Sequence, residues 1–283
     1  MKLRIYQTLW GFEGTPASAV ATARVCGYDG LEGQPPSSAA ARDEWRKMLD
    51  DADLDYLAEI CTMESYIPRA GASPAEHLAS LRRQAEAALT CRPRFATVLA
   101  GSDSWALAQS VDFLGGCLEI GRELGLPLSI ETHRSRCTYS PWVTRSLLEQ
   151  LPELRLTCDF SHWCCVCERL VLEEEPELLA LCASRAQHVH ARVGYDQGPQ
   201  VPHPAAPEYG EALRAHEGWW QAIWDAQEQA GFDCTTMTPE FGPDGYLHSV
   251  PFTKQPLADL DDLNCWMAER QRGRFADRLA RAA

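Results

Sequence analysis

Four side chains that can bind a metal ion stand at comparable places in the second half of the chain, each at the end of a short apolar run. They are Glu131, Asp159, His190 and Glu240. Two Glu, one Asp and one His form a mainly oxygen donor set, which suits Mn²⁺ or Mg²⁺ and, less specifically, Co²⁺ or Zn²⁺. We therefore predict one catalytic divalent metal ion. The competing interpretation of any one of these residues is a helix cap or an ion-pair partner.

Such a site needs a fold that brings the ends of several strands together. Short apolar runs alternate with helical stretches along the chain, which favours strand–helix units around a parallel sheet. The predicted strands cover residues 3–8, 30–32, 55–61, 95–100, 127–131, 155–159, 186–190 and 235–241. The predicted helices cover residues 37–52, 74–89, 104–124, 141–151, 176–183, 216–230 and 257–283.

Eight strands within 283 residues indicate an α/β fold, a single-domain closed (β/α)8 barrel over residues 1–283, because such barrels commonly have about 250 residues. Reactive side chains of these barrels lie where strands end and the next loops begin. The four candidate ligands are therefore expected on one rim. The Arg-rich last helix is expected to pack on the barrel, with a membrane or partner contact as the alternative.

The charge and hydropathy of the chain disfavour some classes of binding partner. The chain has 26 Lys and Arg against 40 Asp and Glu, a net charge of −14, and such a surface repels nucleic acid and anionic membranes. No stretch approaches the roughly 18 apolar residues of a membrane span, and the first residues do not resemble a signal peptide. We expect a cytoplasmic location.

The 12 cysteines are expected to be reduced, mostly buried thiols. Cys164 and Cys167 have the CxxC spacing of some zinc and redox sites, but no second pair follows them. Buried or incidental thiols are the favoured interpretation of this cluster.

Two further motifs accompany the candidate ligands: a D-x-x-H element, Asp159 and His162, and an H-x-H element, His188 and His190. With these motifs and the segments 131–136 and 239–243, the chain resembles the sugar phosphate isomerase/epimerase family, whose fold is a xylose isomerase-like TIM barrel. The likeness covers nearly the whole chain. Members include ketose 3-epimerases, hydroxypyruvate isomerase and inosose dehydratase.

The resemblance implies a role for each matching residue. Glu131, Asp159, His190 and Glu240 would bind one divalent metal ion, and His162 and Arg192 would hold substrate oxygens. Glu131 and Glu240 would be the acid/base pair, one removing a proton from the carbon beside a carbonyl and the other returning a proton on the opposite face of the enediolate.

Other residues near the predicted rim are weaker candidates. His133, Arg134 and Arg136 follow Glu131 and are predicted to bind substrate, with a carboxylate or phosphate as the target of the arginines and solvation of one or two of them as the alternative. Wall positions in the pocket are expected for Tyr6, Gln7, Trp10, Glu32 and Glu59.

Two expectations concern the seventh strand and the loop after it. His188 is expected to point away from His190 and to belong to the core or to the groups that orient the ligands. The Pro- and Gly-rich stretch of residues 194–210 is expected to be a loop that closes over the site and offers Tyr195, Gln200 or His203 to the substrate.

The expected function is isomerisation or epimerisation of a small carbohydrate-like keto-sugar or related polyol through an enediolate. The alternative is a dehydratase, a lyase acting on a keto-cyclitol or keto-sugar, because the same proton abstraction eliminates water when a hydroxyl lies on the β-carbon. An abasic-site endonuclease is disfavoured by the net charge and by the single four-ligand set. A barrel without catalysis ranks low, and a homo-oligomer is compatible with the family.

Overall fold

Eight parallel strands form a closed barrel in the computed structural model, which describes residues 1–243 and 245–282. Each strand pairs with the next along the chain, and β1 pairs with β8. The strands are β1 (Lys2–Thr8), β2 (Gly30–Gly33), β3 (Asp55–Cys61), β4 (Ala96–Leu99), β5 (Leu128–Glu131), β6 (Leu156–Cys158), β7 (Ala186–His190) and β8 (Cys234–Thr238). The predicted single-domain (β/α)8 barrel is confirmed.

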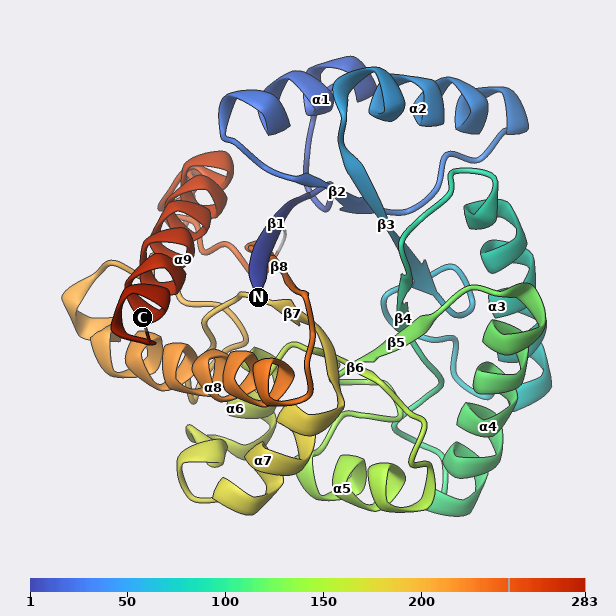
Figure 1. The fold of residues 1–283 in the computed structure, drawn as a ribbon. Helices are drawn as coiled ribbons and strands as arrows, with labels where there is room; N and C mark the ends of the chain where they lie inside the picture. The colour runs from blue at the N-terminus through green and yellow to red at the C-terminus, as the bar shows by residue number, and fades with distance from the viewer. Residues whose placement is uncertain (244, 283) are drawn as a thin grey trace.

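Helices surround the strands in a ring (Figure 1). They are α1 (Pro16–Val25), α2 (Ala39–Ala52), α3 (Pro74–Leu89), α4 (Leu107–Leu124), α5 (Pro141–Gln150), α6 (Ser161–Cys167), α7 (Pro176–Arg185), α8 (Gly210–Gln229) and α9 (Leu260–Ala282), with short 3₁₀ turns η1 (Val171–Glu173) and η2 (Pro207–Tyr209). The ring closes where α9 lies between α8 and α1 (Figure 1).

Local sequence explains where several helices begin and end. Ser73 and Glu76 form a capping box at the start of α3, which also has Pro74 in its first turn, where a missing N–H costs nothing. Gly125 ends α4 in the left-handed conformation with φ of 65°, which a residue without Cβ adopts at little cost.

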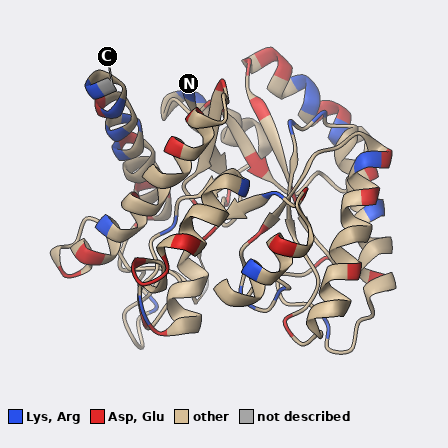
Figure 2. Ribbon diagram, turned by 60° about the horizontal axis from the view of Figure 1, so that its bottom comes forward, with Lys and Arg blue, Asp and Glu red and all other residues tan. Residues whose placement is uncertain are grey.

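The structure corrects some predicted boundaries. Neither α1 nor α6 was among the predicted helices, and α8 begins at Gly210, six residues before the predicted start. The last helix packs on the barrel as expected, with Leu263, Met267 and Phe275 buried. Its arginines give the concentration of Lys and Arg along the C-terminal helix in Figure 2.

The cysteines are free thiols, and Cys158, Cys164 and Cys182 are buried. Within residues 1–243 and 245–282, no metal-competent group includes a cysteine. The CxxC spacing therefore reflects the short α6, which contains Cys164 and Cys167. In the described part of the chain, no helix has both the length and the apolar character needed to cross a membrane.

Candidate metal centre

The four predicted ligands meet at the carboxyl end of the barrel. Glu131 and His190 are the last residues of β5 and β7, Asp159 follows β6 directly, and Glu240 lies two residues after β8. All four side chains are buried. Each contributes one donor atom, and these atoms all lie within 4.8 Å of one another.

The surroundings of His190 suit a metal ligand. Its Nδ1 lies 3.1 Å from an oxygen of Glu240 and 3.5 Å from an oxygen of Glu131. This nitrogen is buried and has no hydrogen-bond partner among the described residues. Because a buried polar atom without a partner is costly, a metal ion bound by Nδ1 and the two carboxylates fits the geometry.

The charges also suit a cation. Asp159 and Glu240 share one guanidinium, that of Arg192, which bonds Asp159 and lies 3.6 Å from Glu240. With His190 as the neutral imidazole that binds metal, three ionised carboxylates beside one arginine would leave two negative charges uncompensated in a buried volume. A divalent ion supplies that charge.

Burial and charge shift the protonation of these groups. Burial raises the pKa of Glu131 to about 8, against the pull of His190. Burial also raises the pKa of Asp159, against the pull of Arg192. For His190, burial lowers the pKa, but the carboxylates of Glu240, Glu32 and Glu131 outweigh burial and raise it well above its ordinary value. These side chains therefore tend to hold protons, which a metal ion would displace.

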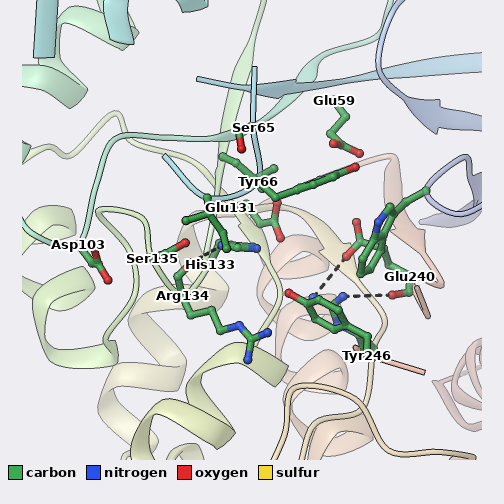
Figure 3. Close-up of a pocket in the computed structure, with 14 residues that line it drawn as sticks. Glu59, Ser65, Tyr66, Asp103, Glu131, His133, Arg134, Ser135, Glu240 and Tyr246 are labelled. Atoms are coloured by element: carbon green, nitrogen blue, oxygen red, sulfur yellow. Dashed lines mark hydrogen bonds and ion pairs between the residues drawn. The ribbon is translucent and has the colours of Figure 1, made fainter. Parts of the chain in front are cut away.

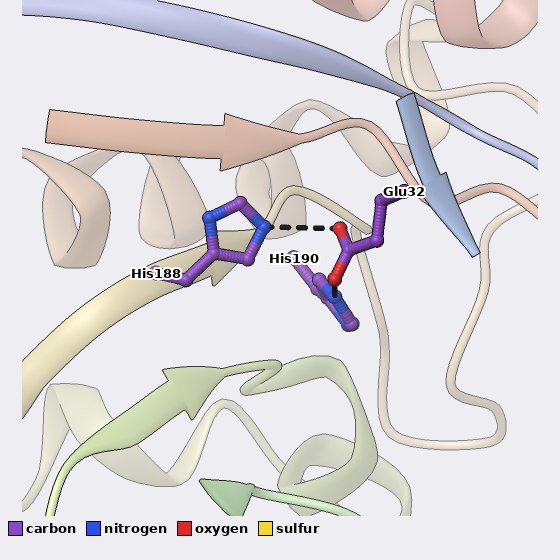
Figure 4. Close-up of side chains that lie close together, drawn as sticks. All are labelled: Glu32, His188 and His190. Atoms are coloured by element: carbon purple, nitrogen blue, oxygen red, sulfur yellow. Dashed lines mark hydrogen bonds and ion pairs between the residues drawn. The ribbon is translucent and has the colours of Figure 1, made fainter. Parts of the chain in front are cut away.

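Glu32 supports the centre from inside the barrel (Figure 4). Its two oxygens lie 3.1 Å from Nε2 of His190 and 3.1 Å from Nε2 of His188. Burial raises the pKa of Glu32, but the two histidines prevail and lower it well below its usual range. Thr97 and Thr238 donate to the same carboxylate, at 2.8 and 2.5 Å.

The expectation for the direction of His188 is wrong. His188 and His190 are two residues apart on β7, so their side chains leave the strand on the same side, and both reach Glu32 inside the barrel. Glu32 was expected on the pocket wall, but it bonds the histidines instead. A role of His188 in orienting the ligands is compatible with this placement.

A cavity of about 760 Å³ opens beside two of the four candidate ligands, Glu131 and Glu240 (Figure 3). Its walls include Glu131 and Glu240, and also His133 and Arg192, two of the three residues predicted to contact substrate. His162 is buried behind them, packed on His133 with ring centroids 4.0 Å apart, and its Nε2 accepts a hydrogen bond from Arg192 at 2.8 Å. Trp10 and Glu59 line the cavity as expected.

Arg134 and Arg136 differ in what they contact. Arg134 lines the cavity. Arg136 is fully buried and donates to backbone carbonyls, at 3.1 Å to Thr62 and Tyr66 and also to Ser65. The structure therefore places Arg136 as a support for the loop after β3 and leaves only Arg134 facing the cavity.

Residues 194–210 do not form the expected cover. Gln200 is buried, its Nε2 donates to the carbonyl of Gly242 at 3.2 Å, and its Oε1 accepts from the N–H of Gly242 at 2.8 Å. Tyr195 packs on Tyr209, and His203 lies near Trp266. None of the three proposed contact residues lines the cavity. Gln200 instead fastens this stretch to the segment after β8.

Several wall residues were missed by sequence reasoning. They lie in the loops after β3, β4, β5 and β8: Ser65, Tyr66, Ile67, Asp103, Ser135 and Tyr246. The aromatic residues among them form a cluster, because Trp10 lies 5.9 Å from Tyr66 and 4.9 Å from Tyr246 between ring centroids. Their position after strand ends was the only available signal.

The fold and the rim of metal-competent side chains define a class of TIM-barrel proteins, and comparison identifies the family. Residues 20–198 match the model of the xylose isomerase-like TIM barrel, so the chain belongs to that family. No curated protein matches the sequence.

Solved structures of similar fold have several activities. An L-ribulose 3-epimerase is 14% identical, with 100% of this chain and 98% of that chain covered and a TM-score of 0.66. A probable 3-DHS dehydratase from Bacillus anthracis is 15% identical, with coverage of 95% and 98% and a TM-score of 0.58. Endonuclease IV from Thermus thermophilus is 17% identical, with coverage of 98% and 100% and a TM-score of 0.60. At these identities the likeness establishes the fold alone.

Proposed function

We propose that the protein is a divalent-metal-dependent isomerase or epimerase of a small keto-sugar or related polyol. One observation supports this most: four buried metal-competent side chains meet beside a cavity, and two of them, Glu131 and Glu240, line it. The similar fold of an L-ribulose 3-epimerase supports the substrate class by analogy.

Glu131, Asp159, His190 and Glu240 are the proposed ligands of one ion, with Mn²⁺ or Mg²⁺ preferred to Co²⁺ or Zn²⁺ by the mainly oxygen donor set. A bound ion would polarise the substrate carbonyl and make the hydrogen on the neighbouring carbon more acidic. Arg192 and His133 are proposed to hold substrate oxygens. His162 is proposed to contribute to substrate binding through Arg192, from which its Nε2 accepts a hydrogen bond.

Glu131 and Glu240 are the proposed acid/base pair. One carboxylate takes the proton from the carbon beside the carbonyl, which leaves an enediolate, and the other returns a proton on the opposite face. Their placement supports this role, because both carboxylates line the cavity, and a carboxylate can bind metal with one oxygen while the other accepts a proton.

Dehydration is the second candidate, and Glu59 favours it. This buried residue faces the cavity, and burial, with Glu240 and Glu32 nearby, raises its pKa to about 7. A carboxyl that keeps its proton near neutral pH can donate it to a departing hydroxyl. Loss of the carbon-bound proton to one Glu and of the β-hydroxyl as water would then give an unsaturated ketone.

The proposal does not extend to DNA repair. Endonuclease IV shares the fold, but the net charge of −14 opposes binding to a polyphosphate backbone. A small polar substrate suits the cavity better.

The test combines metal content with exchange of carbon-bound hydrogen. Wild type, Glu240→Gln, His190→Ala and the control Glu44→Gln, an exposed residue of α2, are purified without chelator and measured by metal mass spectrometry. Wild type and the control are expected to hold about one ion per chain, and the two site variants much less. The metal-loaded protein is then incubated with keto-sugars in D₂O.

Deuterium incorporation next to the carbonyl with return of an epimer or isomer would support isomerisation. Deuterium incorporation with loss of water from the product would support dehydration. Wild-type protein that neither retains nor takes up a divalent ion would contradict both.

A further inference from the structure

Arg134 is a cation that faces the cavity without a carboxylate partner. It lines the cavity wall, and within residues 1–243 and 245–282 no carboxylate oxygen lies within 4.0 Å of its guanidinium. Its side chain donates to the neutral thiol of Cys165 at 3.8 Å and contacts Tyr246. Most of its five N–H donors are therefore available to a ligand.

The two neighbouring arginines are already engaged. Arg192 bonds Asp159 and lies 3.6 Å from Glu240. Arg136 is buried among backbone carbonyls of the loop after β3. Arg134 differs from both, because no carboxylate or carbonyl of the described chain accepts a hydrogen bond from its guanidinium.

The guanidinium of Arg134 lies over an aromatic ring. Its guanidinium carbon lies 5.0 Å from the ring centroid of Tyr246, and that of Arg192 lies 4.8 Å from the same centroid. The two guanidinium carbons are therefore less than 10 Å apart. At bond lengths of about 1.5 Å, an extended chain of five or six carbons spans roughly 6 Å, so one such molecule can reach from the neighbourhood of Arg192 to Arg134.

The other charged groups on the cavity wall leave room for an anion at Arg134. Glu131 and Glu240 belong to the proposed metal centre, and Glu59 has a pKa raised to about 7 by burial. Asp103 is exposed and lies on the opposite side of the cavity from Glu240 (Figure 3). With a divalent ion on the three carboxylates of the centre, Arg134 is the cation on the cavity wall that no carboxylate of the described residues pairs with.

We propose that Arg134 binds a carboxylate of the substrate, so that the substrate is a keto-sugar acid and not a neutral ketose. The proposal rests on the function proposed above and adds the substrate class. One guanidinium matches one carboxylate through two parallel N–H···O bonds. A phosphate carries about two negative charges, and the described residues offer no second unpaired cation on the wall for it.

The test uses pairs of ligands that differ only in the group assigned to Arg134. D-fructuronate and D-fructose differ at C6, carboxylate against CH₂OH, and D-tagaturonate and D-tagatose form a second pair. Binding to metal-loaded protein is measured by calorimetry and by tryptophan fluorescence, since Trp10 lines the cavity. The variants are Arg134→Gln, which removes the charge, Arg134→Lys, which keeps it, and the control Arg46→Gln on α2.

Wild type and Arg46→Gln are expected to bind at least one acid about tenfold to a hundredfold more tightly than its neutral partner, the usual range for a charge-assisted hydrogen bond. Arg134→Gln should lose this preference while its affinity for the neutral sugar and its metal content stay unchanged. Arg134→Lys should keep part of the preference. The exchange rate at saturation should change less than the apparent affinity.

The substrate assignment is wrong if metal-loaded wild type binds neither acid more tightly than its neutral partner, or if Arg134→Gln weakens acid and neutral sugar equally. Stronger binding of D-fructose 6-phosphate than of either acid would also overturn it. These outcomes differ from those that would contradict the proposed function itself. Failure of that function would appear as absence of bound metal or of exchange of carbon-bound hydrogen.

Discussion

Glu32 determines which nitrogen of His190 faces the candidate centre. A histidine ligand needs one ring nitrogen to bind metal and a partner that holds the other, which fixes the tautomer and the ring orientation. Glu32 accepts at Nε2 of His190, and this leaves Nδ1 toward Glu131 and Glu240. Sequence reasoning overlooked this function, because β2 contributes none of the predicted ligands.

Replacing Glu32 by Gln should weaken metal binding without removing a ligand. The neutral amide cannot stabilise a proton on Nε2 as a carboxylate does, so we expect a loss of about tenfold to a hundredfold in affinity for Mn²⁺. Competition with a fluorescent chelator measures the affinity, and Glu44→Gln serves as the control. An unchanged affinity with intact fold would show that Glu32 does not position His190.

At the scale of elements, the strands were predictable and the connections were not. A barrel strand buried on both faces leaves a near-continuous apolar run, as in β4 with the sequence ATVL, and such runs identify strands directly. The seven-residue α6 follows Asp159 with the sequence SHWCCVC, which is too short to express a helical period. Sequence reasoning therefore found the rim that carries Glu131 and His190 but missed the loops that shape the cavity.

The stretch after β7 illustrates why the loops resisted prediction. Its Pro and Gly content favoured a mobile cover, yet Gln200 makes two hydrogen bonds to Gly242, a residue 42 positions away. Contacts of this kind between distant residues leave no local pattern. The same holds for Tyr246, whose place beside Arg134 depends on the path of the whole segment after β8.

His216 of α8 ties the helix to the end of β7. Its Nδ1 donates to the carbonyl of Ala212 at 2.9 Å, and its Nε2 accepts from the N–H of Gly194 at 3.2 Å. Burial lowers the pKa of His216 to about 4, below the ordinary value near 6.5. The unfolded chain therefore binds this proton more strongly than the folded one, so the stabilisation is present above pH 6.5 and is lost as the pH falls toward 4.

When the pH falls from 7.5 to 5.5, the effect of His216 should lower the free energy of unfolding by about 1 kcal/mol. His216→Gln removes the titrating group, so its unfolding free energy should fall by that much less over the same interval. Urea unfolding at the two pH values measures both proteins. Parallel decreases in wild type and variant would contradict the assignment, whatever the stability of the variant at pH 7.5.

At the scale of the whole molecule, α9 completes the ring of helices (Figure 1). Most of its arginines are engaged within the chain: Arg270 and Arg274 reach Glu217 of α8, and Arg278 reaches Asp225 and Glu228. On the other side, Arg272 donates to the carbonyl of Gly27 at 2.6 Å. The basic helix thus joins the last and first parts of the barrel, and its charges do not form a separate basic surface.

Glu217 is the central residue of this closure, and its removal should destabilise the whole barrel. Its side chain is 7% exposed and accepts from Arg270 at 2.6 and 3.1 Å and from Gln271 at 3.1 Å. Glu217→Gln leaves these donors without a charged partner, so we expect a loss of about 2 kcal/mol in unfolding free energy, measured in urea.

The matched control is Glu228→Gln, an ion-pair partner on the same helix that is 43% exposed and should change stability little, because water screens exposed pairs. Equal effects of the two substitutions would mean that burial of Glu217 does not determine how firmly α9 closes the ring.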